Sequence, residues 1–344
     1  MIIVMKRGAS EKDLQRLLKN VQEWGLKPNV SRGTERTVIG LIGDDSVIAE
    51  KPIDVMPGVE SVMRVLKPYK LASSEHHPQR TRITIPPARK GDKPLVFGGK
   101  EIVFVAGPCS VETRETMMET AKAVKRAGAR ALRAGAFKPR TSPYAFQGLG
   151  VEGLRLLAEV RAETGLPIIT EVMDTRDVEM VAEAADIMQV GARNVQNYNL
   201  LKAVGRTTRP VLLKRGMAST LEELLMSAEY IMSQGNANVI LCERGIRTFE
   251  KFTRNTLDLN AVPVLKRESH LPVAVDPSHG TGYRDLVAPM ALASVAAGAD
   301  SIMVEVHPQP EKAWSDGSQT LSVQQFESLM KQCRAVAKAV GRSV

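Results

Sequence analysis

Eight short apolar runs recur at a regular interval through most of the chain. The first and last begin 198 residues apart in seven steps, a spacing of about 28 residues that is typical of βα units. Each run is predominantly apolar rather than alternating, as expected for strands buried on both faces. Residues 101–344 are therefore predicted to form a (β/α)8 TIM barrel. The runs begin at Val103, Ala131, Pro167, Ile187, Pro210, Val239, Pro272 and Ser301.

Helix-like stretches separate these runs. Residues 113–128 and 220–235 carry apolar side chains at three- and four-residue intervals, and both stretches end at glycine, a common helix terminator. The segment GLGVEG, residues 148–153, matches a dinucleotide-binding fingerprint but follows no strand, so a turn leading into a helix is expected there.

Residues 1–72 are predicted to form a separate domain. Strand, helix, hairpin, helix and strand are expected in that order, which is the βαββαβ pattern of a ferredoxin-like fold. The first helix follows Ser10 and ends at Gly25, the second is expected over residues 58–66, and the last strand over 68–73. Residues 73–100 are rich in proline and basic residues, and are expected to form a linker and a short hairpin over the barrel floor.

Composition narrows the class of protein. Hydrophobic residues make up 43% and charged residues 25% of the 344, as in ordinary folded proteins. The most apolar stretch, residues 286–299, is too short to span a membrane, and no signal peptide or disulfide framework is visible, which predicts a cytoplasmic protein. The net charge is +9, but only 4% of residues are aromatic and no long basic block occurs, so nucleic-acid binding is not expected.

Polar residues follow the apolar runs, at the strand ends that form the active-site face of such barrels. Cations dominate, and cations gathered at one mouth predict a ligand with phosphate and carboxylate groups. In strand order the positions are Cys109, Arg133 with Lys138 and Arg140, Glu171, Arg193, Lys214 with Arg215, Arg244 with Arg247, Asp276 with His279, and Glu305 with His307.

Four side chains at this mouth are candidates for one metal site. Cys109, His279, Glu305 and Asp316 offer a thiolate, an imidazole and two carboxylates. This mixed set favours Mn²⁺, Fe²⁺, Co²⁺ or Zn²⁺ over Mg²⁺ or Ca²⁺, which prefer oxygen ligands alone. A divalent metal ion that polarises a carbonyl group is therefore predicted.

The remaining cysteines and histidines are expected to be structural or exposed. Cys242 lies within an apolar run and Cys333 on the last helix, so both are expected in the core. His76, His77 and His270 have no other ligand type beside them, and solvated positions are expected for them.

Seven ordered motifs span the barrel: AGPCS, RAGAFKPRTSPYAFQGLG, GARNVQN, LLKRGM, LCERGIRTFE, VDPSHGTG and MVEVHPQPEKAWSDG. Together they resemble 3-deoxy-D-arabino-heptulosonate 7-phosphate (DAHP) synthases of the type I beta subfamily. The resemblance implies an enzyme, a transferase that condenses phosphoenolpyruvate with D-erythrose 4-phosphate and water, giving DAHP and phosphate. That reaction is the first step of the shikimate pathway to chorismate and the aromatic amino acids.

The resemblance also implies roles for individual residues. It gives the metal ligands as Cys109, His279, Glu305 and Asp316, in agreement with the donor set above. It implies that Arg140 and Thr141 bind the phosphate of erythrose 4-phosphate. The chemistry of the condensation adds Lys138 as proton donor to the developing alkoxide. The residues implied to bind phosphoenolpyruvate are Arg133, Lys138, Arg193, Lys214 and Arg244.

Two alternatives stay open beside this interpretation. A 3-deoxy-manno-octulosonate 8-phosphate synthase would use arabinose 5-phosphate, but it typically carries KANRS where this chain has KPRT. A metabolite-binding regulator with an inert barrel would need no metal site.

The role of the N-terminal domain and the assembly are further expectations. The domain resembles one through which some family members are inhibited by tyrosine or phenylalanine, and assembly or coverage of the barrel mouth is its plainer role. A homotetramer or a homodimer is expected.

Overall fold

A computed structural model describes residues 1–33, 35–42, 51–63, 67–89 and 91–344. The chain divides into two compact units, Met1–Pro68 and Tyr69–Val344, and each has a hydrophobic core of its own. None of the described helices is both long enough and apolar enough to cross a membrane.

The N-terminal unit is a four-stranded sheet in the order β2-β3-β1-β4, with antiparallel pairing throughout. Helix α1 (Glu11–Glu23) begins after Ser10, whose hydroxyl accepts a hydrogen bond from the Asp13 N–H. Leu17 and Val21 of this helix pack against the sheet, so α1 and the strands enclose a core. The strands are β1 (Ile2–Met5), β2 (Lys27–Arg32), β3 (Thr37–Ile42) and β4 (Val59–Met63).

Two elements predicted for this part of the chain are wrong. Residues 59–63 form β4 rather than a helix, because they pair with β1 and complete that side of the sheet; residues 64–66 lie outside the described chain. The strand expected over 68–73 is a series of turns, because Tyr69 and Ala72 are buried in the core of the barrel unit instead.

The larger unit is a closed parallel barrel whose eight strands follow one another in sequence order. Every apolar run forms the strand predicted for it, because each is buried against side chains on both faces. The strands are β7 (Val103–Gly107), β8 (Ala131–Arg133), β9 (Ile168–Val172), β10 (Ile187–Val190), β11 (Val211–Lys214), β12 (Val239–Glu243), β13 (Val273–Val275) and β14 (Ser301–Glu305).

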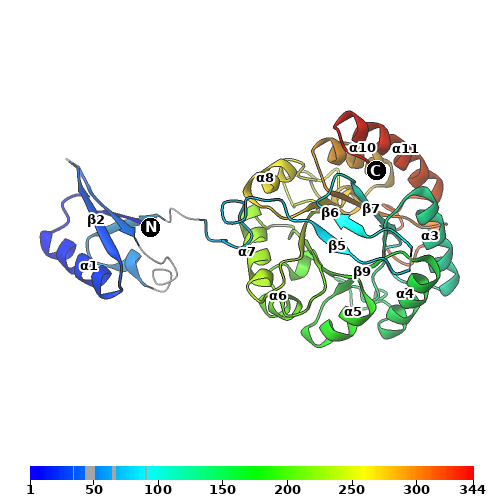
Figure 1. The fold of residues 1–344 in the computed structure, drawn as a ribbon, viewed down its shortest axis with the longest axis horizontal. Helices are drawn as coiled ribbons and strands as arrows, with labels where there is room; N and C mark the ends of the chain where they lie inside the picture. Colours follow the sequence, from blue (N-terminus) through cyan, green and yellow to red (C-terminus); the bar gives the residue numbers. More distant parts are fainter. Residues whose placement is uncertain (34, 43–50, 64–66, 90) are drawn as a thin grey trace. The chain divides into compact units, whose positions relative to one another are not determined.

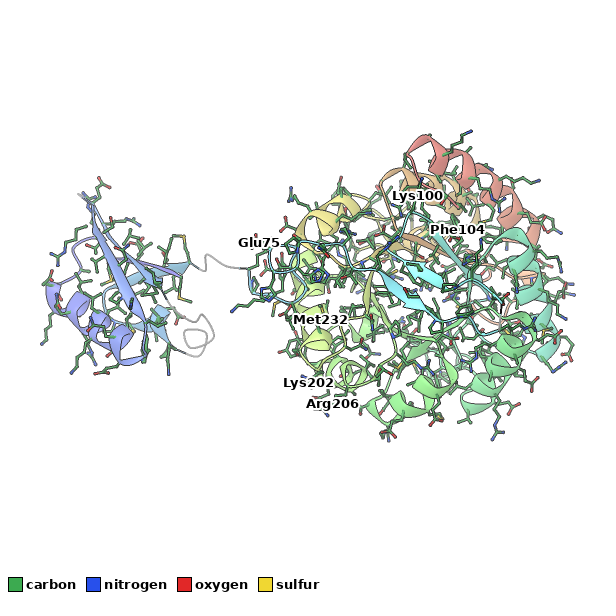
Figure 2. The ribbon with its side chains drawn as sticks, in the orientation of Figure 1. Glu75, Lys100, Phe104, Lys202, Arg206 and Met232 are labelled. Atoms are coloured by element: carbon green, nitrogen blue, oxygen red, sulfur yellow. The ribbon has the colours of Figure 1, made fainter. Side chains whose placement is uncertain are left out.

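Helices surround these strands in a ring (Figure 1). Phe104 of β7 belongs to the core between the strands and this ring, whereas Lys202 and Arg206 lie on its outer side (Figure 2). The helices are α3 (Arg114–Ala127), α4 (Val151–Thr164), α5 (Val178–Ala184), α6 (Tyr198–Gly205), α7 (Leu221–Met232), α8 (Ala261–Glu268), α10 (Arg284–Ala296) and α11 (Val323–Ala339).

Residues 148–153 form the predicted turn into α4. Gly148 has a φ of +94°, and a Cβ there would lie 2.2 Å from the Ala136 carbonyl oxygen. Only glycine permits that approach without strain.

A short hairpin closes the N-terminal end of the barrel, as predicted. Strands β5 (Ile83–Ile85) and β6 (Leu95–Phe97) are antiparallel and lie across the strands within the ring of helices (Figure 1). Their buried side chains join one cluster with lumen residues such as Val103 and Ile187. Catalytic groups are therefore expected at the opposite, C-terminal end.

His270 is buried, so the solvated position expected for it is wrong. Its exposed fraction is 3%, because residues 69–81 cross over it at the start of β13. His270 Nε2 lies 2.7 Å from the Leu71 carbonyl oxygen and Nδ1 lies 2.6 Å from Thr81 Oγ1. His76 and His77 are exposed, and Cys242 and Cys333 are buried, as predicted.

Candidate active site

A cavity of about 420 Å³ opens at the C-terminal ends of the barrel strands. Eight of its described lining residues are Lys or Arg, whereas only Glu171 and Asp316 contribute carboxylates. Such an excess of positive charge suits a ligand that carries several negative charges. The cations are Arg133, Lys138, Arg140, Arg193, Lys214, Arg244, Arg247 and Arg254.

Most residues predicted for the site lie at this mouth. Thr141, His279 and Asp316 line the cavity together with seven of the eight predicted cations. Arg215, the eighth, does not line it, and its NH1 instead donates to the carboxylates of Glu243 and Asp258, each at 2.8 Å. Cys109 and Glu305 lie directly behind it, since Cys109 Sγ is 2.9 Å from Lys138 Nζ and Glu305 Oε1 is 3.0 Å from Arg133. Their roles stay predictions, but their convergence is observed.

Three potential metal ligands lie close together. The ligand atoms of Cys109, Glu305 and Asp316 are all within 4.8 Å of one another. His279 is next to them, with Nε2 3.5 Å from Glu305 Oε1. A sulfur, a nitrogen and two carboxylates therefore face one small volume. These four residues, Cys109, His279, Glu305 and Asp316, are called the donor cluster below.

His279 is oriented by the turn that precedes it. Asp276 is the N-cap of the short helix α9 (Pro277–Thr281), and its carboxylate accepts from the His279 N–H at 3.0 Å. The same carboxylate lies 2.7 Å from His279 Nδ1, which leaves Nε2 facing Glu305. This arrangement of a carboxylate behind an imidazole is common at metal sites.

Asp276 also joins this imidazole to the cations of the cavity, since its Oδ2 accepts from Lys214 Nζ at 2.6 Å. Burial alone would raise the pKa of Asp276, but His279 and Lys214 outweigh that effect and hold the pKa well below its ordinary value. Asp276 is therefore a carboxylate that both partners share.

The electrostatics of Cys109 fit a site that receives a cation. Burial, reinforced by the nearby Glu305 carboxylate, raises the pKa of the Cys109 thiol to about 12. Its Sγ donates to Asp316 Oδ2 at 3.1 Å. Burial opposes ionisation of Asp316 as well, but His279, the Cys109 hydrogen bond and Arg254 lower its pKa to about 2. A divalent cation would offset these carboxylates and stabilise the thiolate, which is the form that binds metals.

Arg244 differs from the other buried cations. Its exposed fraction is 5%, and within the described chain its guanidinium has one weak contact, 3.5 Å from NH1 to the Gly245 carbonyl. Burial lowers its pKa. A buried guanidinium facing a cavity without a carboxylate partner needs an anionic ligand.

Arg254 lines the cavity but was not predicted as a site residue. It lies in the long loop between β12 and α8 rather than at a strand end, and its NH1 is 3.6 Å from Asp316 Oδ1 and 2.9 Å from Gln319 Oε1. The spaced basic residues at 244, 247, 251 and 254 were the available signal.

Comparison with known proteins agrees with this architecture. The DAHP synthetase I family model matches residues 87–341, and the DAHP synthase ferredoxin-like domain model matches residues 1–67. A phospho-2-dehydro-3-deoxyheptonate aldolase of Thermotoga maritima is 52% identical over 344 residues, all of both chains. A 2-dehydro-3-deoxyphosphooctonate aldolase of Caulobacter vibrioides is 34% identical over 255 residues, 68% of this chain and 87% of its own.

Solved structures give the same result. The crystal structure of the Thermotoga maritima enzyme, titled as a DAHP synthase, matches with a TM-score of 0.91 and 50% identity over 100% of this chain and 98% of that one. A truncated form of the Thermotoga maritima synthase matches with a TM-score of 0.73 and 48% identity, covering 80% of this chain and 99% of its own. The chain belongs to the DAHP synthetase I family. Its likeness to a DAHP synthase extends over the full length, whereas the octulosonate enzyme matches only part of it.

Proposed function

We propose that this chain condenses phosphoenolpyruvate with D-erythrose 4-phosphate and water to give DAHP and phosphate. The observation that carries the proposal is the cation-lined cavity beside the Cys109 donor cluster, at the catalytic end of a barrel that resembles a DAHP synthase over its full length. This reaction is the first step of the shikimate pathway.

In this proposal four buried cations and the exposed Arg193 bind phosphoenolpyruvate. Lys214 and Arg244 offer positive charge within the cavity, and Arg133 and Lys138 lie between the cavity and the donor cluster. Arg193 completes the set. Because two anionic substrates repel each other, these cations lower the cost of bringing them together and orient the reacting carbons.

Arg140 and Thr141 are proposed to bind the phosphate of erythrose 4-phosphate. Both line the cavity, and Arg193 holds their loop, since its guanidinium donates to the Pro139 carbonyl at 3.2 Å and to Thr141 Oγ1 at 3.3 Å. Arabinose 5-phosphate, the alternative substrate, is one carbon longer, so the position of this loop would decide between the two sugars.

A divalent metal ion is proposed as the cofactor, held by Cys109, His279, Glu305 and Asp316. When bound, such an ion would polarise the aldehyde of the sugar phosphate. The donor set suits Mn²⁺, Fe²⁺, Co²⁺ or Zn²⁺, and the raised pKa of Cys109 means that metal binding releases a thiol proton.

The remaining chemistry is assigned to this chain's own residues. C3 of phosphoenolpyruvate attacks the aldehyde carbon, and Lys138 donates a proton to the alkoxide oxygen that develops. Water then adds at C2, and phosphate leaves with cleavage of its C–O bond. Lys138 Nζ lies 2.9 Å from Cys109 Sγ, which supports a proton donor next to the proposed aldehyde site.

The test is the loss of the ultraviolet absorbance of phosphoenolpyruvate. Erythrose 4-phosphate and arabinose 5-phosphate are supplied in separate cuvettes, each with EDTA and again after Mn²⁺ is restored. Rapid loss with erythrose 4-phosphate alone, abolished by EDTA and recovered with Mn²⁺, is expected. Turnover of arabinose 5-phosphate only would favour the octulosonate activity, and no turnover of either would favour the inert sensor.

Three wider proposals accompany this function. Residues 1–68 are proposed to bind an inhibitory aromatic amino acid, tyrosine or phenylalanine, which is supported by their separate core and their match to a dedicated domain model. A homotetramer is proposed because symmetric assembly is common among enzymes of this kind. A cytoplasmic location is proposed because Cys109, Cys242 and Cys333 are all free, as suits a reducing compartment.

A further inference from the structure

The donor cluster forms only if two loops hold Cys109 and Asp316 close together. One follows β7 and carries Cys109; the other, residues 308–321, follows β14 and carries Asp316. Asp316 has a φ of +52°, and it is the one non-glycine residue in the described chain with a positive φ. Such a conformation persists where surrounding contacts hold it in place.

A buried pair, Glu112 and His307, links these loops behind the donor cluster. Glu112 is 3% exposed and His307 is 4% exposed. Glu112 Oε2 lies 3.0 Å from His307 Nε2, and Glu112 Oε1 accepts from the Trp314 N–H at 2.9 Å. The Glu112 carboxylate therefore binds His307, directly before the loop, and the backbone N–H of Trp314, two residues before Asp316.

The hydrogen bonds define the tautomer of His307. Its Nδ1 accepts from the Gln309 N–H at 3.0 Å, so in the neutral ring Nε2 carries the hydrogen and donates to Glu112. Glu112 thus accepts two hydrogen bonds from two donors. A hydrogen bond of 2.8 Å between Ser110 Oγ and Ser315 Oγ joins the same two loops at the residues adjacent to Cys109 and Asp316.

We propose that Glu112 and His307 are positioning residues that hold Asp316 against Cys109 and thereby set the affinity of the metal site. Neither side chain is among those lining the cavity, so both act through the loop rather than on substrate. The inference rests on the metal site proposed above and deepens it. Partners behind metal ligands commonly change metal affinity by about 10- to 100-fold when they are removed.

Glu112→Gln is the sharpest single change because it preserves size. An amide has one accepting oxygen and one donating nitrogen, so in either orientation its NH₂ group faces the His307 Nε2–H or the Trp314 N–H. His307→Gln in the same chain would let the two amides pair, although the bond from the Gln309 N–H would be lost. The double variant is therefore expected to recover part of what Glu112→Gln loses.

The experiment titrates Co²⁺ into metal-free full-length protein and follows the thiolate-to-cobalt absorption band. In wild type the band reports coordination by Cys109. Glu112→Gln is expected to weaken Co²⁺ binding by about 10- to 100-fold, while calorimetry shows phosphoenolpyruvate binding to the metal-free protein within about twofold of wild type. The Co²⁺ affinity of the double variant is expected to lie between that of wild type and that of Glu112→Gln.

Asp186→Asn is the matched control. Asp186 is likewise a carboxylate with two donors, Arg161 NH1 at 3.2 Å and the Ile168 N–H at 2.8 Å, but its side chain is partly buried, with 14% exposed, and it lies at the opposite end of the barrel. It is expected to lower thermal stability without changing Co²⁺ affinity.

Different outcomes would contradict the proposed metal site and the proposed positioning role. Absence of a thiolate band in wild type would overturn the metal site and this inference with it. A wild-type band with unchanged Co²⁺ affinity in Glu112→Gln would overturn the positioning role alone. If Glu112→Gln does not fold, His307→Gln takes its place with the same expected loss, and unchanged affinity there would count equally against the proposal.

Discussion

Lys138 lies between the cation-lined cavity and the donor cluster. It lines the cavity, and its Nζ contacts both Sγ and the carbonyl oxygen of Cys109, at 2.9 Å and 3.0 Å. Lys138→Met removes the donated proton while keeping an unbranched side chain, so kcat should fall by about 10²- to 10⁴-fold. Steady-state kinetics at saturating substrates measures this effect.

Lys202→Met is the control for that change, because Lys202 lies on the outer side of the helix ring (Figure 2). It should leave kcat unchanged. Near-normal turnover of Lys138→Met would remove Lys138 as the proton donor.

His270 gives a prediction for stability against pH. Burial lowers the pKa of His270, so the unfolded chain binds this proton more tightly than the folded one does. As pH falls from 7 through the ordinary value of 6.5, the free energy of unfolding should decrease, and this loss ends once the pH is below the folded pKa.

The measurement is urea unfolding at pH 7, 6 and 5. His270→Gln should lower the stability at pH 7 by about 1–2 kcal/mol through lost hydrogen bonding, and its decline toward pH 5 should be shallower than that of wild type. His76→Gln, at an exposed position, should retain the wild-type slope. Parallel slopes for all three proteins would mean that His270 does not contribute to the pH dependence.

At the scale of elements, the β5–β6 hairpin is expected to stabilise the barrel. Phe97 is fully buried in the lumen cluster, so Phe97→Ala should cost about 3–5 kcal/mol of unfolding free energy through lost contacts and a cavity. Chemical denaturation measures it. Val96, half-buried on the other face of the same strand, provides the control, and an equal cost for Val96→Ala would argue against a specific role for the lumen face.

Whether a strand could be predicted from the sequence depended on how it is buried. The eight barrel strands were predictable because burial on both faces makes each run predominantly apolar rather than alternating. The segment 58–66 was misassigned because spaced valines suit a helix as well as a strand, and its pairing with β1 decided the outcome.

At the scale of the whole molecule, the two units should be separable. The cut belongs before Tyr69, since Tyr69 is buried in the barrel core and the Leu71 and Ala72 N–H groups donate to the Glu229 carboxylate, each at 2.9 Å. A chain lacking residues 1–68 should retain synthase activity and lose inhibition by tyrosine or phenylalanine. Initial rates with and without each amino acid test this, and equal inhibition of both proteins would place the effector site elsewhere.

Local residue patterns were sufficient to predict the barrel and the side chains gathered at its mouth. Apolar runs define strands locally, and parallel closure sends every strand end to one face, so Cys109, His279, Glu305 and Asp316 could be expected together. Only the tertiary structure decided which groups support them. Glu112 and His307 lie 195 positions apart, and His270 is buried by a segment far from it in the chain. Such partnerships depend on packing between distant loops, which no local pattern of residues encodes.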